Sequence, residues 1–407
     1  MKYDLLIKNA KIVSARSTES GCIAVKDGKI AAIVADSTGL EAVRVIDAGG
    51  KPVIPGCIDV HVHFRDPGLT YKEDFSTGSM AAAAGGVTTA FDMPNVQPPT
   101  LNVENFLIKK KIAEEKSYIN YGIYAYLVNN LDQIDPLIEA GVCGFKWDLS
   151  TFDWELPEGY YLPDNNEAAD IFKAIAAHDY VVTVHAEDME LVKHFTEHLK
   201  ESGRDPKDFF NHVEARPDVV EVSALYRTFI LSEVSGCRVH ITHLTSKRGL
   251  ELIKEFQHKG TPVTSDVGPA WFTFCAEDYE KYGGGIRVIP AIRYEKDREA
   301  LWNGLASGQI EVLATDHAPH SNDEKFNRSW WDTLPGTIGV QTSLPIMLDH
   351  VNKGEVTLNR VVECMCEKPA EIFGLAPRKG LIEVGADADL VVLDMDREWT
   401  VTHEEMY

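Results

Sequence analysis

An alternation of apolar, strand-like runs with amphipathic, helix-like segments constrains the fold of this chain most strongly. Eight apolar runs occur within about 300 residues, the span that one (β/α)8 barrel needs. A helix-like segment follows each run, such as Ala81–Ala84, which Gly85-Gly86 terminates, or Glu167–His178. The pattern predicts an α/β fold with a (β/α)8 TIM barrel. The predicted strands are 57–63, 87–92, 119–126, 142–147, 181–185, 238–243, 262–266 and 311–315.

The two ends of the chain have a different pattern. Short strands separated by turns such as Asp27-Gly28 and Gly49-Gly50 fill the first part, and similar strands follow Gly380. Such strands need partners, so we expect both termini to meet in one small β-sandwich domain. The predicted organisation is 1–54 for the N-terminal part of the β domain, 55–375 for the barrel and 376–407 for the C-terminal part.

Charge and composition narrow the range of partners and compartments. The chain has 40 basic and 63 acidic residues, a formal charge of -23, with no basic cluster that could follow a phosphate backbone. We therefore expect no nucleic-acid partner, and an anionic ligand would need a locally placed cation. The seven scattered cysteines favour a reducing compartment. With no secretory signal and no apolar run long enough to span a bilayer, a cytoplasmic protein without membrane contact is expected.

Side chains able to bind metals or substrate occur at six of the eight predicted strand ends, the edge where barrel enzymes place their active sites. Because His61 and His63 lie two residues apart on a strand, both rings project from one face and can bind the same ion. Asp316 can bind an ion and also transfer a proton. The six ends carry His61 with His63, Asn95, Lys146, His185, His243 and Asp316.

Each of these residues also has a structural explanation when it is considered alone. His185 and His243 each end an apolar run, where a histidine can be a hydrogen-bonded core residue. Asp316 could cap the loop that follows its strand. We interpret the neighbouring His240 as structural. The shared edge of the barrel favours a metal site over these separate explanations.

Lys146 does not fit a simple ligand set, because an ammonium group cannot bind a metal. A lysine at a buried strand end is usually paired with an acid. Burial, however, lowers the pKa of a lysine and frees the neutral amine. That amine can capture carbon dioxide as a carbamate, whose two oxygens can bridge metals about 3.5–4 Å apart. Beside four histidines, a carboxylated Lys146 is the simplest account.

The chain resembles the amidohydrolase superfamily, and within it the dihydroorotases, along nearly its whole length. The resemblance implies two divalent metal ions, with zinc as the usual expectation. His61 and His63 would bind one ion with Asp316, His185 and His243 would bind the other, and carboxylated Lys146 would bridge both. The motifs that carry it are Ile54-Pro55-Gly56-Cys57-Ile58-Asp59, His61-Val62-His63-Phe64-Arg65, Gly85-Gly86-Val87-Thr88-Thr89, Asp92-Met93-Pro94-Asn95 and Ala314-Thr315-Asp316-His317-Ala318-Pro319-His320.

The same resemblance implies a set of substrate contacts. Arg65, Asn95 and His320 match those of dihydroorotases, and Thr151 matches a contact from their mobile loop. A guanidinium group can hold a carboxylate through two hydrogen bonds, so a small substrate that bears a carboxylate is expected. The alternative is that Arg65 forms a structural ion pair with Asp66 or Glu73.

The function that the resemblance implies is reversible hydrolysis of (S)-dihydroorotate to N-carbamoyl-L-aspartate in pyrimidine biosynthesis. A hydroxide between the two metals would attack the C6 carbonyl, and Asp316 would pass the proton to the leaving ring nitrogen. An allantoinase or hydantoinase has the same metal set without the need for Arg65, and a non-catalytic scaffold would be expected to have lost ligands. The family also implies a homodimer and an association with aspartate transcarbamoylase.

Three departures from the family pattern bear on these expectations. The chain has Gly268-Pro269-Ala270-Trp271 where many members carry a Pro-His-His run. It has Val288-Ile289-Pro290-Ala291 where many have an asparagine before two prolines. Both segments border the expected substrate site, so a changed specificity is compatible with them. Because the sequence ends at Tyr407, the β domain is also expected to lack its last strand.

Overall fold

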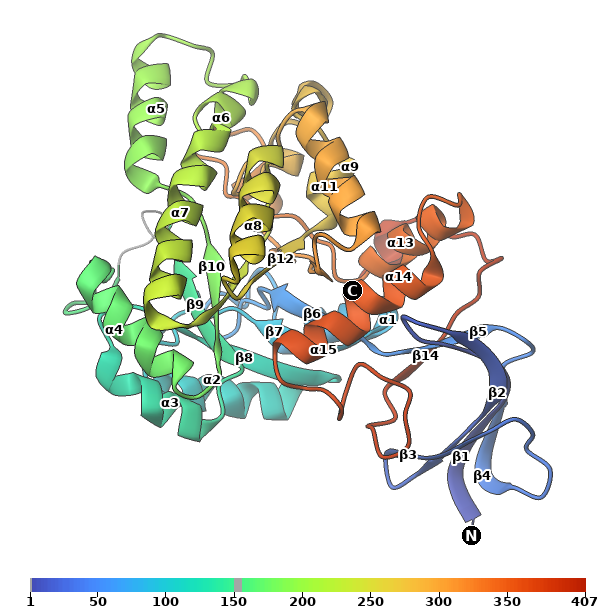
Figure 1. Ribbon diagram of the computed structural model, residues 1–407. Coiled ribbons are helices and arrows are strands. Elements are labelled where there is room, and N and C mark those ends of the chain that lie inside the picture. The colour runs from blue at the N-terminus through green and yellow to red at the C-terminus, as the bar shows by residue number, and fades with distance from the viewer. Residues whose placement is uncertain (1, 150–155) are drawn as a thin grey trace.

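The computed structural model describes residues 2–149 and 156–407. Its larger part is a sheet of eight parallel strands in sequence order, surrounded by helices (Figure 1). The segment after the last strand returns to the first, where His63 N donates to His317 O at 2.8 Å, so the barrel nearly closes. The (β/α)8 prediction is confirmed. The strands are β6 (Cys57–Val62), β7 (Val87–Asp92), β8 (Asn120–Tyr126), β9 (Gly144–Asp148), β10 (Val181–His185), β11 (Arg238–Ile241), β12 (Val263–Val267) and β13 (Val312–Leu313).

The helices form because apolar residues recur at the spacing of a helical face. In α4 the side chains of Ala168, Ile171, Phe172 and Ile175 are buried, while Asp164 caps the first turn. The helices are α1 (Phe75–Ala84), α2 (Val103–Lys116), α3 (Ile134–Ala140), α4 (Asn165–Ala176), α5 (Met189–Glu201), α6 (Phe210–Glu214), α7 (Asp218–Ser235), α8 (Lys247–Lys259), α9 (Pro269–Thr273), α10 (Tyr279–Tyr282), α11 (Glu295–Ser307), α12 (Asn322–Lys325), α13 (Ser343–Asn352), α14 (Leu358–Val362) and α15 (Lys368–Ile372). Shorter turns are η1 (Leu131–Gln133), η3 (Ala276–Asp278), η4 (Gly283–Ile286), η5 (Glu363–Glu367) and η6 (His403–Glu405).

A second sheet of six strands lies beside the barrel and combines five strands from the N-terminal part of the chain with one, β14, from the C-terminal part (Figure 1). The C-terminal strand β14 pairs antiparallel with β5, with Val391 opposite Ile54. The first strand is one long element where the sequence indicated only short strands, and its pairing with β2 shifts register between Ile7 and Ala10. The strands are β1 (Lys2–Val13), β2 (Thr18–Lys26), β3 (Lys29–Val34), β4 (Glu41–Asp47), β5 (Pro52–Pro55) and β14 (Leu390–Val392).

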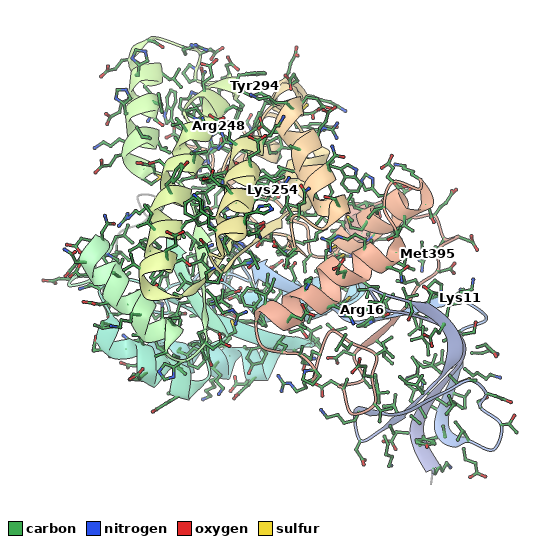
Figure 2. All side chains as sticks on the ribbon, viewed as in Figure 1. Lys11, Arg16, Arg248, Lys254, Tyr294 and Met395 are labelled. Atoms are coloured by element: carbon green, nitrogen blue, oxygen red, sulfur yellow. The ribbon has the colours of Figure 1, made fainter. Side chains whose placement is uncertain are left out.

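The barrel strands are buried on both faces, whereas charged side chains lie on the outer surface of the helices (Figure 2). Arg248 on α8, for example, is half exposed and lies 3.1 Å from Asp218 at the start of α7. Among the helices that the structure describes, none is long and apolar enough to cross a membrane. Most charged side chains therefore face solvent. The polar side chains that are buried at the strand ends are the exception, and their burial indicates a functional site.

Candidate functional site

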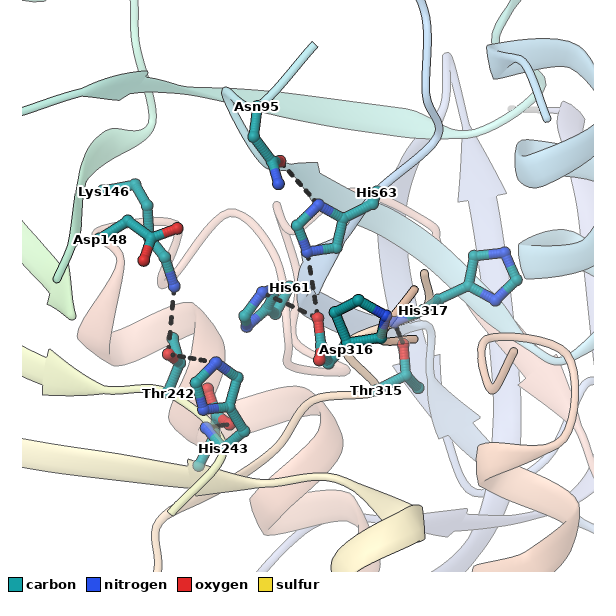
Figure 3. A network of polar contacts seen from close by, with 12 residues as sticks. His61, His63, Asn95, Lys146, Asp148, Thr242, His243, Thr315, Asp316 and His317 are labelled. Atoms are coloured by element: carbon teal, nitrogen blue, oxygen red, sulfur yellow. Dashed lines mark hydrogen bonds and ion pairs between the residues drawn. The ribbon is translucent and has the colours of Figure 1, made fainter. Parts of the chain in front are cut away.

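Four histidine rings converge at the carboxyl ends of the barrel strands, and Figure 3 shows part of this cluster. His61 lies on β6 and His63 follows it, while His185 ends β10 and His243 follows β11. The ring centroids of His61 and His243 are 5.2 Å apart, and those of His185 and His243 are 4.6 Å apart. The structure thus brings together all four histidines that the sequence singled out.

Asp316 lies beside the first histidine pair. Its Oδ1 atom is 3.0 Å from His63 Nε2 and 3.2 Å from His61 Nε2, and one donor atom from each residue lies within 4.8 Å of the other two. His61 Nδ1 and His243 Nδ1 are buried without a hydrogen-bond partner in the described part of the chain. Burial also holds the pKa of both rings well below its usual range, so each is neutral. Neutral imidazoles beside a carboxylate are donors that a divalent metal ion requires, so these residues fit one.

Lys146 is buried beside the second histidine pair. Its Nζ atom donates to Thr242 Oγ1 at 3.1 Å, and that hydroxyl donates in turn to the carbonyl oxygen of Val184. Among the described residues, the Lys146 amine bonds to a hydroxyl and forms no ion pair, so the expected alternative of a direct acid partner is not formed. Burial lowers the pKa of Lys146, which favours the neutral amine that carbamate formation requires.

The surrounding residues fix the direction in which two rings point. Asn95 Oδ1 accepts from His63 Nδ1 at 2.7 Å, which leaves Nε2 directed at Asp316. His185 Nε2 lies 2.9 Å from Glu187, and Glu187 is in turn bonded to Arg216. Glu187 was not predicted from the sequence, although it stands two residues after His185, where strand alternation could have indicated it.

The backbone around His243 and Asp316 is unusual. His243 has φ of 37° and Asp316 has φ of 48°, values in the left-handed region that side chains other than glycine rarely adopt. Asp266 compensates at His243 by accepting from its backbone nitrogen at 2.6 Å. His240, interpreted above as structural, supports the same carboxylate at 3.0 Å. Strained backbone supported by neighbouring hydrogen bonds is typical of functional sites.

Arg65 is a buried cation that forms no ion pair with any residue the structure describes. Its Nε atom donates to the carbonyl oxygen of Pro319 at 3.2 Å, and its side chain touches His320. The two carboxylates that could have paired with it are engaged elsewhere, since Asp66 lies 2.6 Å from Lys116 and Glu73 lies 2.9 Å from His317. Among the described residues no carboxylate lies within 4.0 Å of Arg65. The ion pair with Asp66 or Glu73, which was the alternative role of Arg65, is therefore not formed in the described part of the chain.

The departures from the family pattern meet beside the histidines. The ring of Trp271 lies 5.6 Å from that of His243, and its Nε1 atom donates to Pro290 O at 3.0 Å. This hydrogen bond joins Trp271 to the segment that contains Pro290. Thr151, the remaining predicted substrate contact, lies outside the described residues, so its contact stays a prediction.

Two cavities lie away from this cluster. One, of about 280 Å³, is lined by Val181, Arg238 and Val263, which belong to the amino-terminal ends of their strands. The other, of about 290 Å³, is lined by residues such as Val213 and Tyr294. Neither contains the histidines. We therefore locate the candidate site by the convergence of donor atoms rather than by the size of a cavity.

Comparisons with known proteins cover nearly the whole chain. The model of the amidohydrolase family matches residues 53–405. The L-hydantoinase of Paenarthrobacter aurescens is 38% identical over 97% of this chain and 86% of its own length, and an allantoinase of Deinococcus radiodurans is 33% identical over 98% and 89%. The solved structure of the L-hydantoinase (dihydropyrimidinase) from Arthrobacter aurescens has a TM-score of 0.95 at 37% identity and covers 99% of this chain and 90% of that one.

These relatives overturn the dihydroorotase interpretation. It depended on Arg65, Asn95 and His320, three loop residues, whereas similarity over the whole chain is to a hydantoinase and to allantoinases. Loops after many strands surround a barrel site, so three matching positions do not determine the substrate. The superfamily part of the resemblance is confirmed, and on the match over residues 53–405 and these full-length relatives, the chain belongs to the amidohydrolase family.

Proposed function

We propose that the protein hydrolyses a cyclic amide of the hydantoin type that carries an anionic substituent. The ring type is supported by relatives that are named hydantoinase and allantoinase and match 97% or more of the chain. The anionic substituent is supported by Arg65, a buried guanidinium with no carboxylate within ion-pairing distance among the described residues. A buried charge without a partner is costly, so a substrate carboxylate would stabilise it.

We propose two divalent ions, with zinc as the ion that this histidine-rich donor set favours. His61, His63 and Asp316 would hold one, and His185 and His243 would hold the other, with a carbamate on Lys146 between them. Such ions, when bound, polarise a carbonyl and lower the pKa of water.

The protein's own groups account for binding and proton transfer. Arg65 would orient the ring by holding the substituent, so that the scissile carbonyl faces the histidine cluster. When water adds to that carbonyl, Asp316 would accept its proton and deliver it to the ring nitrogen as the carbon–nitrogen bond breaks. The product is an open-chain N-carbamoyl acid, with the atoms of one water added. Asp316 is suited to this role because its carboxylate lies beside the rings of His61 and His63 and is largely buried.

The test compares two substrates that differ only in charge, 5-carboxymethylhydantoin and 5-carbamoylmethylhydantoin. We expect Arg65→Met to lower kcat/KM for the carboxylate by about 100-fold, since leaving a buried charge unpaired costs about 3 kcal/mol. The carboxamide should lose less than about 10-fold, because a neutral hydrogen bond contributes only about 1 kcal/mol.

Arg248→Met serves as the matched control, because Arg248 is an exposed arginine on the outer surface of α8. It should leave both substrates unchanged. Equal losses for both substrates in Arg65→Met would show that Arg65 does not recognise charge. If allantoin, whose ring substituent is neutral, is hydrolysed faster than the carboxylate, the alternative of an allantoinase replaces the anionic substrate.

A further inference from the structure

His320 is surrounded by donors and acceptors from separate segments. Its Nδ1 atom lies 3.0 Å from Lys72 Nζ and 3.5 Å from Glu324 Oε2. Its Nε2 atom lies 2.8 Å from Pro335 O and 3.1 Å from Arg65 Nη2. These four contacts cannot all be hydrogen bonds at once, because a neutral imidazole has one donor and one acceptor nitrogen.

Lys72, on one side of the ring, and the Pro335 carbonyl, on the other, decide which nitrogen carries the proton. Lys72 is held at 3.0 Å from Glu324 Oε1, and its side chain is only 6% exposed, so its ammonium group is fixed beside the ring. An ammonium group donates and cannot accept, so His320 Nδ1 must be the acceptor. The proton of the ring then lies on Nε2, where the carbonyl oxygen of Pro335 accepts it. Burial lowers the pKa of His320 to about 3, so the ring stays neutral.

This assignment changes the meaning of the short distance between Arg65 and His320. Both Arg65 Nη2 and the protonated His320 Nε2 are donors, so the 3.1 Å contact is not a hydrogen bond. Only Nε of Arg65 has an acceptor among the described residues, namely Pro319 O. The hydrogens on its two terminal nitrogens therefore remain available.

We propose that Lys72 is a positioning residue that holds His320 in its Nε2–H tautomer, so that the terminal hydrogens of Arg65 stay free for the anionic substituent of the substrate. The proposal rests on the proposed function for its consequence, but not for the tautomer itself. Without Lys72, the proton of His320 would move to Nδ1 and donate to the Glu324 carboxylate, a stronger acceptor than the Pro335 carbonyl, which would lose its donor. Nε2 would then accept from Arg65 and occupy one of the hydrogens that the substrate needs.

The tautomer is measured directly, without substrate, by ¹⁵N NMR of the metal-loaded protein labelled at histidine. His320→Asn identifies the signals of this ring. We expect an unprotonated Nδ1 and a protonated Nε2 in the wild type, and the reverse in Lys72→Met. Lys72→Arg keeps a donor at this place and should restore the wild-type pattern.

Kinetics with the two hydantoins test the consequence. Lys72→Met should raise KM for the carboxylate about 10-fold, which corresponds to about 1.4 kcal/mol, and leave kcat and the carboxamide nearly unchanged. Tyr71→Phe is the control, because the Tyr71 hydroxyl donates to the same Glu324 carboxylate at 3.0 Å from the neighbouring position without touching His320. If Lys72 only held the loop in place, this control would raise KM for the carboxylate as well.

The proposal is overturned if the wild-type ring carries its proton on Nδ1, or if Lys72→Met leaves the tautomer unchanged. It is also overturned if Tyr71→Phe raises KM as much as Lys72→Met does. If the wild type hydrolyses neither hydantoin, the proposed function fails, while the NMR pattern still decides whether Lys72 sets the tautomer.

Discussion

A buried ion pair between Asp92, at the end of β7, and Lys109, on α2, should be one of the most sensitive positions for stability. Lys109 Nζ lies 2.5 Å from Asp92 Oδ2, and both side chains are fully buried. The other oxygen of Asp92 accepts from Phe64 N at 2.7 Å, directly after His63. The pair therefore supports the backbone that carries His63 and Arg65.

Replacing Lys109 by Met leaves the Asp92 carboxylate buried without its cation. Breaking such a pair costs about 3–5 kcal/mol, because the remaining charge is neither hydrated nor paired. A chain of 407 residues has an unfolding entropy of about 0.85 kcal/mol per kelvin, so a loss of about 4 kcal/mol lowers Tm by about 5 °C. Differential scanning calorimetry measures this shift. Adding Asp92→Asn to Lys109→Met removes the unpaired carboxylate charge, so the double variant should recover part of the lost Tm.

The matched control is Lys368→Met. Lys368 lies 2.6 Å from Glu371, but both side chains are more than a third exposed. Solvent screens such a pair, so Tm should fall by less than about 1 °C. The reasoning is refuted if Lys109→Met melts within about 1 °C of the wild type. It is equally refuted if the double variant is less stable than the single one.

Three further predictions concern the metals, pH and assembly. Lys146→Ala should lose bound metal by elemental analysis, with partial recovery on addition of a short carboxylate; full metal content and activity would exclude the carbamate. Burial, with the nearby charge of Arg287, lowers the pKa of Lys325 from 10.5 to about 7. Between these values the unfolded chain binds more protons than the folded one, so the contribution of Lys325 to stability rises with pH by about 1.4 kcal/mol per unit. Urea unfolding at pH 7.5 and 9 should show this extra slope relative to Lys325→Met, and equal slopes would contradict the depressed pKa. Mass photometry should show the expected homodimer at twice 45.2 kDa, whereas a monomer at micromolar concentration would contradict it.

Much of the barrel and the composition of its site could be predicted from the sequence. The periodicity of buried residues is a local property, so each strand and helix is visible in its own segment. Parallel strands end at one edge, and this rule brought His61, His185 and His243 together although nearly 200 residues separate the first from the last. The single long β1 was less visible, because a register shift lies at its middle.

The choice between competing partners was decided only by the tertiary structure. Arg65 had two acidic neighbours in sequence, but Asp66 pairs with Lys116 and Glu73 with His317, 50 and 244 residues away. The local sequence does not distinguish these partners, so the geometry of the folded loops selects between them.

What the sequence by itself determined is thus the fold and which histidines and aspartate meet at one edge, since both follow from local periodicity and from the common edge of parallel strands. The tertiary structure decided that Arg65 has no carboxylate partner among the described residues and that Lys72 meets His320, 248 residues later. The substrate class is likewise decided by the tertiary structure, because it depends on loops whose positions no local sequence pattern predicts. The physical reason is the same in each case. Periodicity acts within a segment, whereas ion pairs and tautomers depend on which segments the folded chain brings within about 3 Å of each other.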